Sequence, residues 1–427
     1  MDVLLLVVIL FGCFAIGVPV AYSLALASIA GAMWLGVPLE AVMLKISSGV
    51  SKFAMLTIPF FILAGAIMAE GGMARRLVAF ANVLAGFFRG GLSVVNIVAT
   101  SILSGISGSS VADATAIGSV MIPQMEKAGY SRGFSTSVTI SASVQGILVP
   151  PSHNAVIYSL ATGGVISITS LFMAGVIPGL LIALALIFLV LLLAYRKGHP
   201  KGELMTLGQA LRLSFEAMWG LITIVIIIGG ILSGVFTPIE AGAIASVWAF
   251  LVTMFIYRDT PWKDLPYMLY RTVRTSAMVL TLIACAAAFG YVMALMQLPA
   301  KLTELMLATS SNKYVILMLV NLMLLALGFL EDMAPSILIT TPILLPAVEN
   351  VGVHPVHFGI IMLLNLAIGL VHPPVGSTLI VGCAVGKVSM EELMKDMWPF
   401  YIVLVGMLIL VTYIPALSLW LPSLLGL

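Results

Sequence analysis

The sequence predicts an all-α, polytopic membrane protein built from two inverted repeats, each with a re-entrant helical hairpin and a discontinuous helix. Of the 427 residues, 61% are apolar and only 8% are charged, whereas a soluble globular protein carries roughly 25% charged residues. Long apolar runs recur along the whole chain, and glycine, proline and glutamate residues repeat at one constant spacing. A soluble globule, a nucleic-acid-binding protein and a disordered scaffold are therefore excluded.

Ten apolar segments are long enough to cross a bilayer, which takes about 20 residues. In the first half of the chain they are 2–17, 20–36, 53–69, 134–163 and 173–195. In the second half they are 213–234, 240–257, 275–296, 354–386 and 397–424. These segments predict a helical protein that spans the membrane many times.

Two further segments, 93–125 and 313–350, are too long for one span and too short for two spans with a turn. Small, polar or acidic residues interrupt each of them, SGISGSSVADA at 104–114 and GFLEDMAPS at 328–336. Such backbone is tolerated at membrane depth only where protein or a water-filled cavity surrounds it. We therefore expect two hairpins that enter the membrane partway and turn back.

The basic residues give the predicted orientation. If the loop at 195–212 is cytoplasmic, fifteen of the nineteen Lys and Arg residues fall on that side, and only Lys45, Lys52, Lys301 and Lys313 fall outside. This satisfies the positive-inside rule. Both termini are then periplasmic, and the two hairpins enter from opposite faces.

The two halves of the chain repeat at an offset of 223 residues. The matching pairs are Gly105 and Gly328, Pro123 and Pro346, Glu126 and Glu349, Gly129 and Gly352, Gly146 and Gly369, Pro150-Pro151 and Pro373-Pro374, and Gly163 and Gly386. With five spans in each half, the second copy must lie upside down in the membrane, as in the inverted repeats of secondary transporters.

These repeats divide the chain at residue 195. Residues 1–195 form the first repeat, with scaffold spans in 1–69, the hairpin 93–125 and the broken span 134–163. Residues 196–427 form the second, with scaffold spans in 213–296, the hairpin 313–350, the broken span 354–386 and the last span 397–424.

Each repeat carries Pro-Pro in the middle of an apolar span. Proline lacks the backbone donor and costs about 3 kcal/mol in a helix interior, so two in a row are expected to unwind the helix. The carbonyls expected to be freed are those of Gly146, Val149 and Pro151 in the first copy and of Gly369, His372 and Pro374 in the second. Oxygen ligands of this kind suit a small hard cation, and each following half-helix points its positive end at the same region. The alternative is a packing kink that neighbouring helices satisfy.

The hairpin tips carry complementary polar groups. The first has four serines, Ser104, Ser107, Ser109 and Ser110, with Asp113 nearby, and the second has Glu331 and Asp332. An acid at membrane depth is costly and marks a functional site by default. The alternative is that Glu331 or Asp332 only caps the following half-helix, a role that is compatible with ligation.

No motif for a catalytic centre or for nucleotide hydrolysis is present. The three cysteines, Cys13, Cys285 and Cys383, lie far apart without metal-ligand spacing, so we expect no cofactor and no transition metal. A polytopic membrane enzyme that uses Glu331, Asp332 and a histidine is one alternative, and a channel is another. The repeat argues against both, because it duplicates the hairpin and the break but no acid–base pair.

The chain resembles the large membrane subunit of tripartite ATP-independent periplasmic (TRAP) transporters. The likeness covers essentially the whole sequence and depends on IPFFILAGAIMAEGGMARRL (58–77), SGISGSSVADATAIGSVMIP (104–123), GILVPPSHNAVIY (146–158), GVFTPIEAGAIA (234–245) and GLVHPPVGSTL (369–379). The resemblance implies an elevator-type transporter of the ion-transporter-superfamily fold that imports its substrate with sodium ions. The implied partners are a small membrane subunit of about four helices, a periplasmic substrate-binding protein and the lipid bilayer of the bacterial inner membrane.

The resemblance also implies binding residues. One sodium site would use Ser107, Ser109, Gly146, Val149 and Pro151, and its counterpart would use Gly328, Asp332, Gly369, His372 and Pro374. The substrate would contact Ser109, Asn154, Asp332 and Thr378. The family's usual substrates are carboxylates, among them C4-dicarboxylates, sialic acid and other sugar acids. Many dicarboxylate-type members have an apolar residue after PPS, whereas this chain reads PPSHN at 150–154, which favours a hydroxyl-rich sugar acid.

Overall fold

The computed structural model describes residues 2–202, 205–310, 312–328, 331–373 and 376–427, and every regular element in these ranges is a helix. Within them, six helical segments are long and apolar enough to cross a membrane: Phe53–Glu70, Ile168–Lys197, Leu207–Leu232, Pro238–Tyr257, Trp262–Leu295 and Met390–Tyr413. Shorter apolar helices accompany them. The predicted all-α membrane fold is therefore confirmed.

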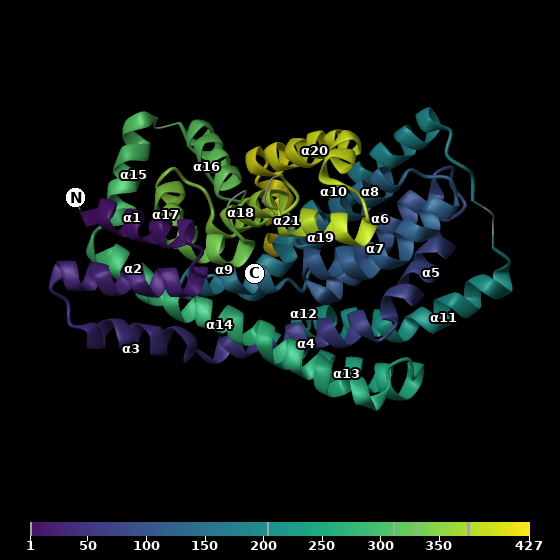
Figure 1. Cartoon of the computed structure of the whole chain (residues 1–427), viewed down its shortest axis with the longest axis horizontal. Coiled ribbons are helices and arrows are strands. Elements are labelled where there is room, and N and C mark those ends of the chain that lie inside the picture. Colours follow the sequence, from purple (N-terminus) through teal and green to yellow (C-terminus); the bar gives the residue numbers. More distant parts are fainter. Residues whose placement is uncertain (1, 203–204, 311, 329–330, 374–375) are drawn as a thin grey trace.

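The helices outside the two hairpin regions form a scaffold layer. From the first half it contains α1 (Asp2–Ala15), α2 (Val20–Leu35), α3 (Leu39–Val50), η1 (Phe53–Leu56) and α4 (Thr57–Glu70). From the second half it contains α11 (Leu207–Ile224), η2 (Val225–Gly229), α12 (Gly230–Leu232), α13 (Pro238–Leu251), η3 (Val252–Tyr257), η4 (Trp262–Asp264) and α14 (Leu265–Leu295). α13 packs along α4, and α14 packs along α2 and α3, so the two halves interleave along the lower edge of Figure 1.

The remaining helices form a second group, which we call the hairpin module. From the first half it contains α6 (Gly91–Ser107), α7 (Ser110–Lys127), α8 (Arg132–Gly146), α9 (His153–Ala161) and α10 (Ile168–Lys197). From the second half it contains α16 (Lys313–Gly328), α17 (Met333–Asn350), α18 (Pro355–Gly369), α19 (Ser377–Gly386), α20 (Met390–Tyr413) and α21 (Ala416–Leu424). α5 (Met73–Ala85) and α15 (Leu298–Thr309) connect the scaffold layer to the two hairpins, as Figure 1 shows.

Both predicted hairpins and both predicted broken helices are present, and their bounds repeat. α7 and α17 begin and end 223 positions apart, and so do α8 and α18. The repeat seen in scattered Gly, Pro and Glu residues is therefore a repeat of whole helices.

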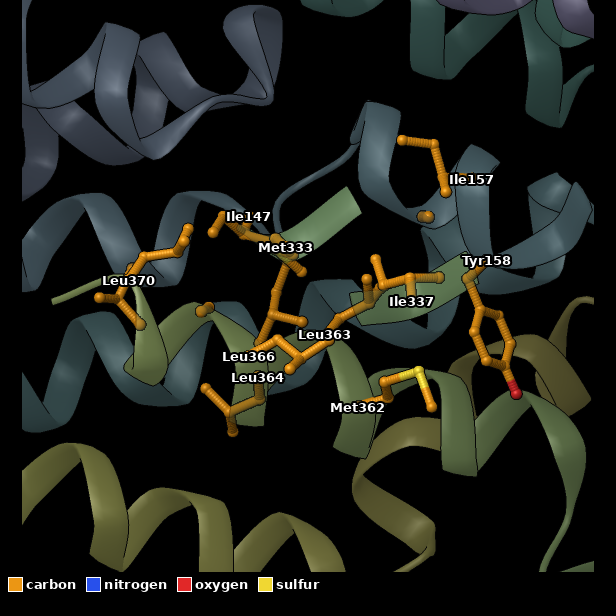
Figure 2. Close-up of a cluster of buried hydrophobic side chains, with 14 of the residues drawn as sticks. Ile147, Ile157, Tyr158, Met333, Ile337, Met362, Leu363, Leu364, Leu366 and Leu370 are labelled. Carbon is orange, nitrogen blue, oxygen red and sulfur yellow. The ribbon is translucent and has the colours of Figure 1, made fainter. Parts of the chain in front are cut away.

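The two broken helices lie at the centre of the hairpin module. Every residue from Gly133 to Gly146 in α8 and from Val356 to Gly369 in α18 is buried. Figure 2 shows Ile147, at the first break, close to Met333 of the second hairpin, with Leu363 and Leu366 of α18 beside them. The first break thus packs on elements of the second repeat.

Three parts of the chain differ from the predicted spans. α3 and α5 are helices in segments that the span prediction left out, because their polar residues hide them from a test based on apolar length. The predicted last span 397–424 is divided instead into α20 and α21, with Ile414 outside the helical region and Pro415 after it. Proline lacks the N–H that would continue the helix, so α20 alone, which starts at Met390, has the length of a span.

Candidate functional site

The tip of the first hairpin is a tight turn at Gly108. Gly108 has φ +58°, and its N–H donates to the carbonyl of Ser104 at 3.0 Å, which ends α6. Ser109 then caps α7 by accepting the N–H of Ala112 at 3.4 Å. Glycine is suited to the left-handed backbone that this turn needs, and a serine at the cap satisfies a free donor of the next helix. The sequence SGSS therefore suits a helix–turn–helix tip.

A buried carboxylate lies directly behind this tip. Asp113, in the first turn of α7, is 0% exposed. Its two oxygens accept hydrogen bonds from the hydroxyls of Ser104 and Ser107. The N–H of Ser109 donates in turn to the Ser107 hydroxyl oxygen at 3.3 Å. The tip is therefore an ordered set of oxygen atoms around one acid.

The first broken helix faces this tip. A Cβ added to Gly108 would lie 2.9 Å from the carbonyl oxygen of Pro151, and a Cβ added to Gly105 would lie 3.5 Å from that of Pro150. At the end of α8, a Cβ added to Gly146 would overlap the Ser104 hydroxyl and lie 3.0 Å from Asp113 Oδ2. The structure thus brings Ser107 and Ser109, on either side of Gly108, to the break between α8 and α9.

The carbonyls of the first break are available to a ligand. Within the described chain, no backbone or side-chain donor reaches the carbonyl oxygens of Gly146, Val149 or Pro151. A buried carbonyl is normally paired, so unpaired carbonyls in a break that contacts a serine-rich tip are candidate oxygen ligands. This is the coordination chemistry that a hard cation prefers.

The second hairpin meets the second break in the same way. A Cβ added to Gly369 would lie 2.7 Å from Gly328 Cα, so the two backbones touch. Asp332 occupies the cap position of α17, and its Oδ1 accepts from the Ser377 hydroxyl at 3.5 Å at the start of α19. Asp332 is exposed and Glu331 is partly exposed. Pro374 lies outside the described residues.

The carbonyls of the second break differ from the prediction. We expected those of Gly369 and His372 to be free, but they accept the N–H groups of His372 and Gly376, each at 3.1 Å. Tyr401 of α20 donates its hydroxyl to the carbonyl of Val371. These two carbonyls are thereby paired within the described part of the break. Each carbonyl keeps a second lone pair, so ligation by Gly369 and His372 stays a prediction.

The predicted substrate residues lie on both repeats. Thr378 of α19 is buried, and its hydroxyl is 2.6 Å from that of Ser110 in α7. This contact joins the first hairpin to the second broken helix. Asn154 is buried near the start of α9, one residue after His153 and two after Ser152, whose hydroxyl has no partner among the described residues. Thr378 and Asn154 thus belong to the walls of the two breaks.

Three residues that lie at the first tip or the second break are absent from the predicted ligand sets. Asp113 and Ser104 form the acid–hydroxyl group behind the first tip, and Tyr401 binds the second break. Asp113 carried a usable signal, since it is an acid at membrane depth one turn after the tip. Nothing local in the sequence around Tyr401 identifies its contact 30 residues away.

Known proteins resemble this chain over its whole length. A sequence profile for the DctM component of tripartite ATP-independent periplasmic transporters matches residues 7–417. The Salmonella typhimurium protein YgiK is 43% identical over 98% of this chain and 97% of its own. The C4-dicarboxylate TRAP transporter large permease protein DctM of Rhodobacter capsulatus is 38% identical over 100% of both chains. The sialic acid TRAP transporter large permease protein SiaM of Vibrio cholerae is 38% identical over 88% of both.

A solved structure shares the fold. The YdaH transporter of Alcanivorax borkumensis, described as having an unusual topology, superposes with a TM-score of 0.61 over 88% of each chain at 14% sequence identity. At this identity the likeness concerns the arrangement of helices alone.

Proposed function

The chain belongs to the DctM family of tripartite ATP-independent periplasmic transporters, and we propose that it imports a small carboxylate with sodium ions as the driving force. Members of this family are transporter subunits, so the chain is a multi-pass membrane permease and not an enzyme. The alternative of an intramembrane enzyme built on Glu331 and Asp332 is therefore wrong.

The observation that carries the sodium proposal is the contact between the first hairpin tip and the first break. The serine-rich turn at Gly108 lies against the carbonyl of Pro151, and the carbonyls of Gly146, Val149 and Pro151 have no donor among the described residues. Unpaired carbonyls in a buried break cost free energy unless something binds them, and an oxygen-only donor set suits an alkali or alkaline-earth cation. In this proposal Ser107, Ser109, Gly146, Val149 and Pro151 hold one sodium ion.

A second sodium ion is assigned to the matching tip and break. Gly328, Asp332, Gly369, His372 and Pro374 would form this site, and Asp332 would supply its negative charge. The close approach of Gly328 to Gly369 supports this assignment. So does the Asp332–Ser377 contact, which places the acid at the start of α19.

The substrate is expected to be a carboxylate that binds between the two tips. The N-termini of α9 and α19 point their positive dipole ends at the breaks, where an anion is stabilised. Ser109, Asn154, Asp332 and Thr378 would contact it, and bound sodium would offset the charge of Asp332. Two relatives, one named for C4-dicarboxylates and one for sialic acid, are each 38% identical to this chain, so identity does not distinguish these substrates. The His153–Asn154 pair favours the sugar acid.

We assign the motion to an elevator mechanism, in which the hairpin module slides against the scaffold layer. The packing of α7 on α8 and α19 and of α16 on α18, all within the module, supports it. The partners would be a small membrane subunit of about four helices and a periplasmic binding protein that delivers the substrate. Both chain ends would face the periplasm.

Uptake into proteoliposomes tests this function. The vesicles contain this chain and its small subunit, and the binding protein with radiolabelled sialic acid or succinate is added outside. An inward sodium gradient is expected to drive accumulation of one of these substrates, and replacing sodium with choline is expected to abolish it. Accumulation that is the same with and without the gradient would contradict sodium coupling.

A further inference from the structure

The two hairpin tips carry the same pair of residue types in opposite order. Ser109 and Asp113 of the first hairpin match Asp332 and Ser336 of the second at the offset of 223 residues. Ser109 and Asp332 occupy the cap positions of α7 and α17, and their partners lie one turn farther along each helix. At these two matched positions each hairpin therefore has one hydroxyl and one carboxylate, and the acid is moved by one helical turn.

The two hairpins also differ in the contacts that these four residues make. Asp113 is fully buried and accepts the hydroxyls of Ser104 and Ser107. Ser336, at the same place in the second hairpin, is 3% exposed, and its hydroxyl has no partner among the described residues. Asp332 instead lies at the open end of its tip and faces Ser377. At the matched positions the carboxylate is thus buried one turn into the helix in the first hairpin and exposed at the helix cap in the second.

The position of Asp113 determines where the hydroxyl protons of the tip point. A serine binds a cation through an oxygen lone pair, so its proton must be donated elsewhere. Asp113 accepts hydrogen bonds from the hydroxyls of both Ser104 and Ser107, and the Ser109 N–H occupies one lone pair of the Ser107 oxygen. The Ser107 oxygen keeps a further lone pair for an ion, and the carbonyl of Pro151 lies close to the neighbouring Gly108.

A buried acid needs a compensating charge to stay ionised, because it is otherwise neutralised by a proton. A carboxylate without a cation is expensive in a low-dielectric interior, and neither Lys127 at the end of α7 nor Arg132 at the start of α8 forms an ion pair with Asp113 in the described chain. A cation bound at the tip would supply this charge.

We propose that Asp113 is a positioning residue of the first sodium site, where its carboxylate orients the hydroxyls of Ser104 and Ser107 and balances the charge of the ion. The proposal rests on the proposed sodium coupling and adds a residue that the predicted ligand set lacks. In the second hairpin Asp332 balances the ion from the cap position, and Ser336 replaces the acid.

The first test is Asp113→Asn in the purified complex with the small subunit. Asparagine keeps the shape but donates a proton to one serine, so that serine must turn its own proton toward the ion. The half-saturating sodium concentration, read from sodium-dependent thermal stabilisation with choline as the replacement salt, is expected to rise at least about tenfold, the loss typical of a hydrogen bond to a charged group. Thr115→Val, an exposed position on the same helix, is the control and should leave this concentration unchanged.

The second test moves the charge. The double variant Ser109→Asp with Asp113→Ser copies the order of the second hairpin and is expected to recover sodium-dependent stabilisation that Asp113→Ser alone loses. The double variant also tests the role of Asp113 if Asp113→Asn does not fold. A wild-type sodium constant in Asp113→Asn, or no recovery in the double variant, would overturn the role of Asp113.

The sodium dependence of the wild-type protein distinguishes a failure of sodium coupling from a failure of the role of Asp113. If the wild type shows no sodium dependence in stability or uptake, the proposed function itself fails, and the role of Asp113 fails with it. If the wild type depends on sodium and Asp113→Asn depends on it equally, only the role of Asp113 fails.

Discussion

Single glycines decide how closely each hairpin tip approaches its broken helix. Gly146 leaves room for the Ser104 hydroxyl and for Asp113, and Gly369 leaves room for the backbone of Gly328. Both are the last residues of their helices, α8 and α18. The absence of a side chain at these two positions therefore lets each hairpin lie directly against its broken helix.

Gly146→Ala is expected to abolish most of the uptake. Its methyl group would overlap the Ser104 hydroxyl and crowd Asp113, and overpacking of a buried position typically costs about 1–3 kcal/mol of stability. Gly406→Ala is the matched control, because this helical position of α20 has open space around it. Uptake and thermal unfolding of both variants measure the effect, and normal uptake by Gly146→Ala would show that this packing is not needed.

His199, in the loop after α10, is expected to make stability depend on pH. Burial, and then the charge of Lys197, lower the pKa of His199, while Asp396 acts in the opposite direction. Its ring stacks near Tyr130 and Phe134, with centroids 4.2 and 5.1 Å away. The unfolded chain then binds the proton more readily than the folded chain, so stability is lost as the pH falls below the ordinary histidine pKa of about 6.5.

The His199 prediction is checked by comparing wild type with His199→Gln. Between about pH 8 and about pH 5, the thermal unfolding midpoint of the wild type should fall by more than that of the variant. Equal falls in the two proteins would mean that His199 does not contribute to the acid sensitivity.

The two broken helices are similar elements with different hydrogen bonding. The carbonyls of the first break stay free, whereas the second break bonds its carbonyls to its own N–H groups and to Tyr401. At the second break a neighbouring helix, α20, supplies a hydrogen bond through Tyr401. At the first tip the hydrogen bonds come from the same hairpin, through Asp113.

Tyr401→Phe is expected to destabilise the second break. It removes the hydroxyl that pairs the buried Val371 carbonyl, and an unpaired buried acceptor costs about 1–3 kcal/mol. Tyr413→Phe, on the same helix, removes only an exposed hydrogen bond of 3.2 Å to the Tyr314 carbonyl and serves as the control. If both variants lower the thermal unfolding midpoint equally, the hydrogen bond to Val371 contributes no more stability than an exposed one.

The sequence was sufficient to predict both hairpins and both breaks. Polar tips and Pro-Pro pairs in apolar segments have few structural solutions, and the repeat doubled each signal. α3 and α5 could not be predicted from apolar length, because each covers only part of a span and carries charges. The carbonyls of Gly369 and His372 were predicted to be free, but both accept hydrogen bonds. A proline pair predicts that a helix unwinds, and it does not predict which N–H groups then bond to the carbonyls. The Tyr401 contact depends on tertiary packing.

At the scale of the whole molecule, the scaffold layer and the hairpin module are interleaved from both repeats. In the described chain, every basic residue that forms an ion pair belongs to the predicted cytoplasmic set: Arg75, Arg76, Arg132, Lys197, Arg212, Arg271 and Lys395. The sidedness of these residues and the orientation of the termini stay proposals.

Cross-links between the two groups test the elevator motion. In a chain with its three native cysteines replaced by serine, Gly105→Cys with Ile224→Cys joins the hairpin module to the scaffold, since a Cβ on Gly105 lies 3.6 Å from Ile224 Cδ1. Mercury bridging of this pair is expected to stop uptake.

The matched control pair is Gly118→Cys with Thr139→Cys, which joins α7 to α8 within the hairpin module, where a Cβ on Gly118 lies 3.3 Å from Thr139 Cγ2. Its bridge should leave uptake intact. Transport that continues with the first pair bridged, or stops with the second, would contradict a module that moves as one body.

The most direct measurement of the central claim is the flux of radiolabelled sodium into proteoliposomes that contain the chain and its small subunit. Sodium is expected to enter only when the binding protein presents its carboxylate outside, and in a fixed ratio to the substrate taken up. Substrate uptake without any accompanying sodium flux would contradict the account.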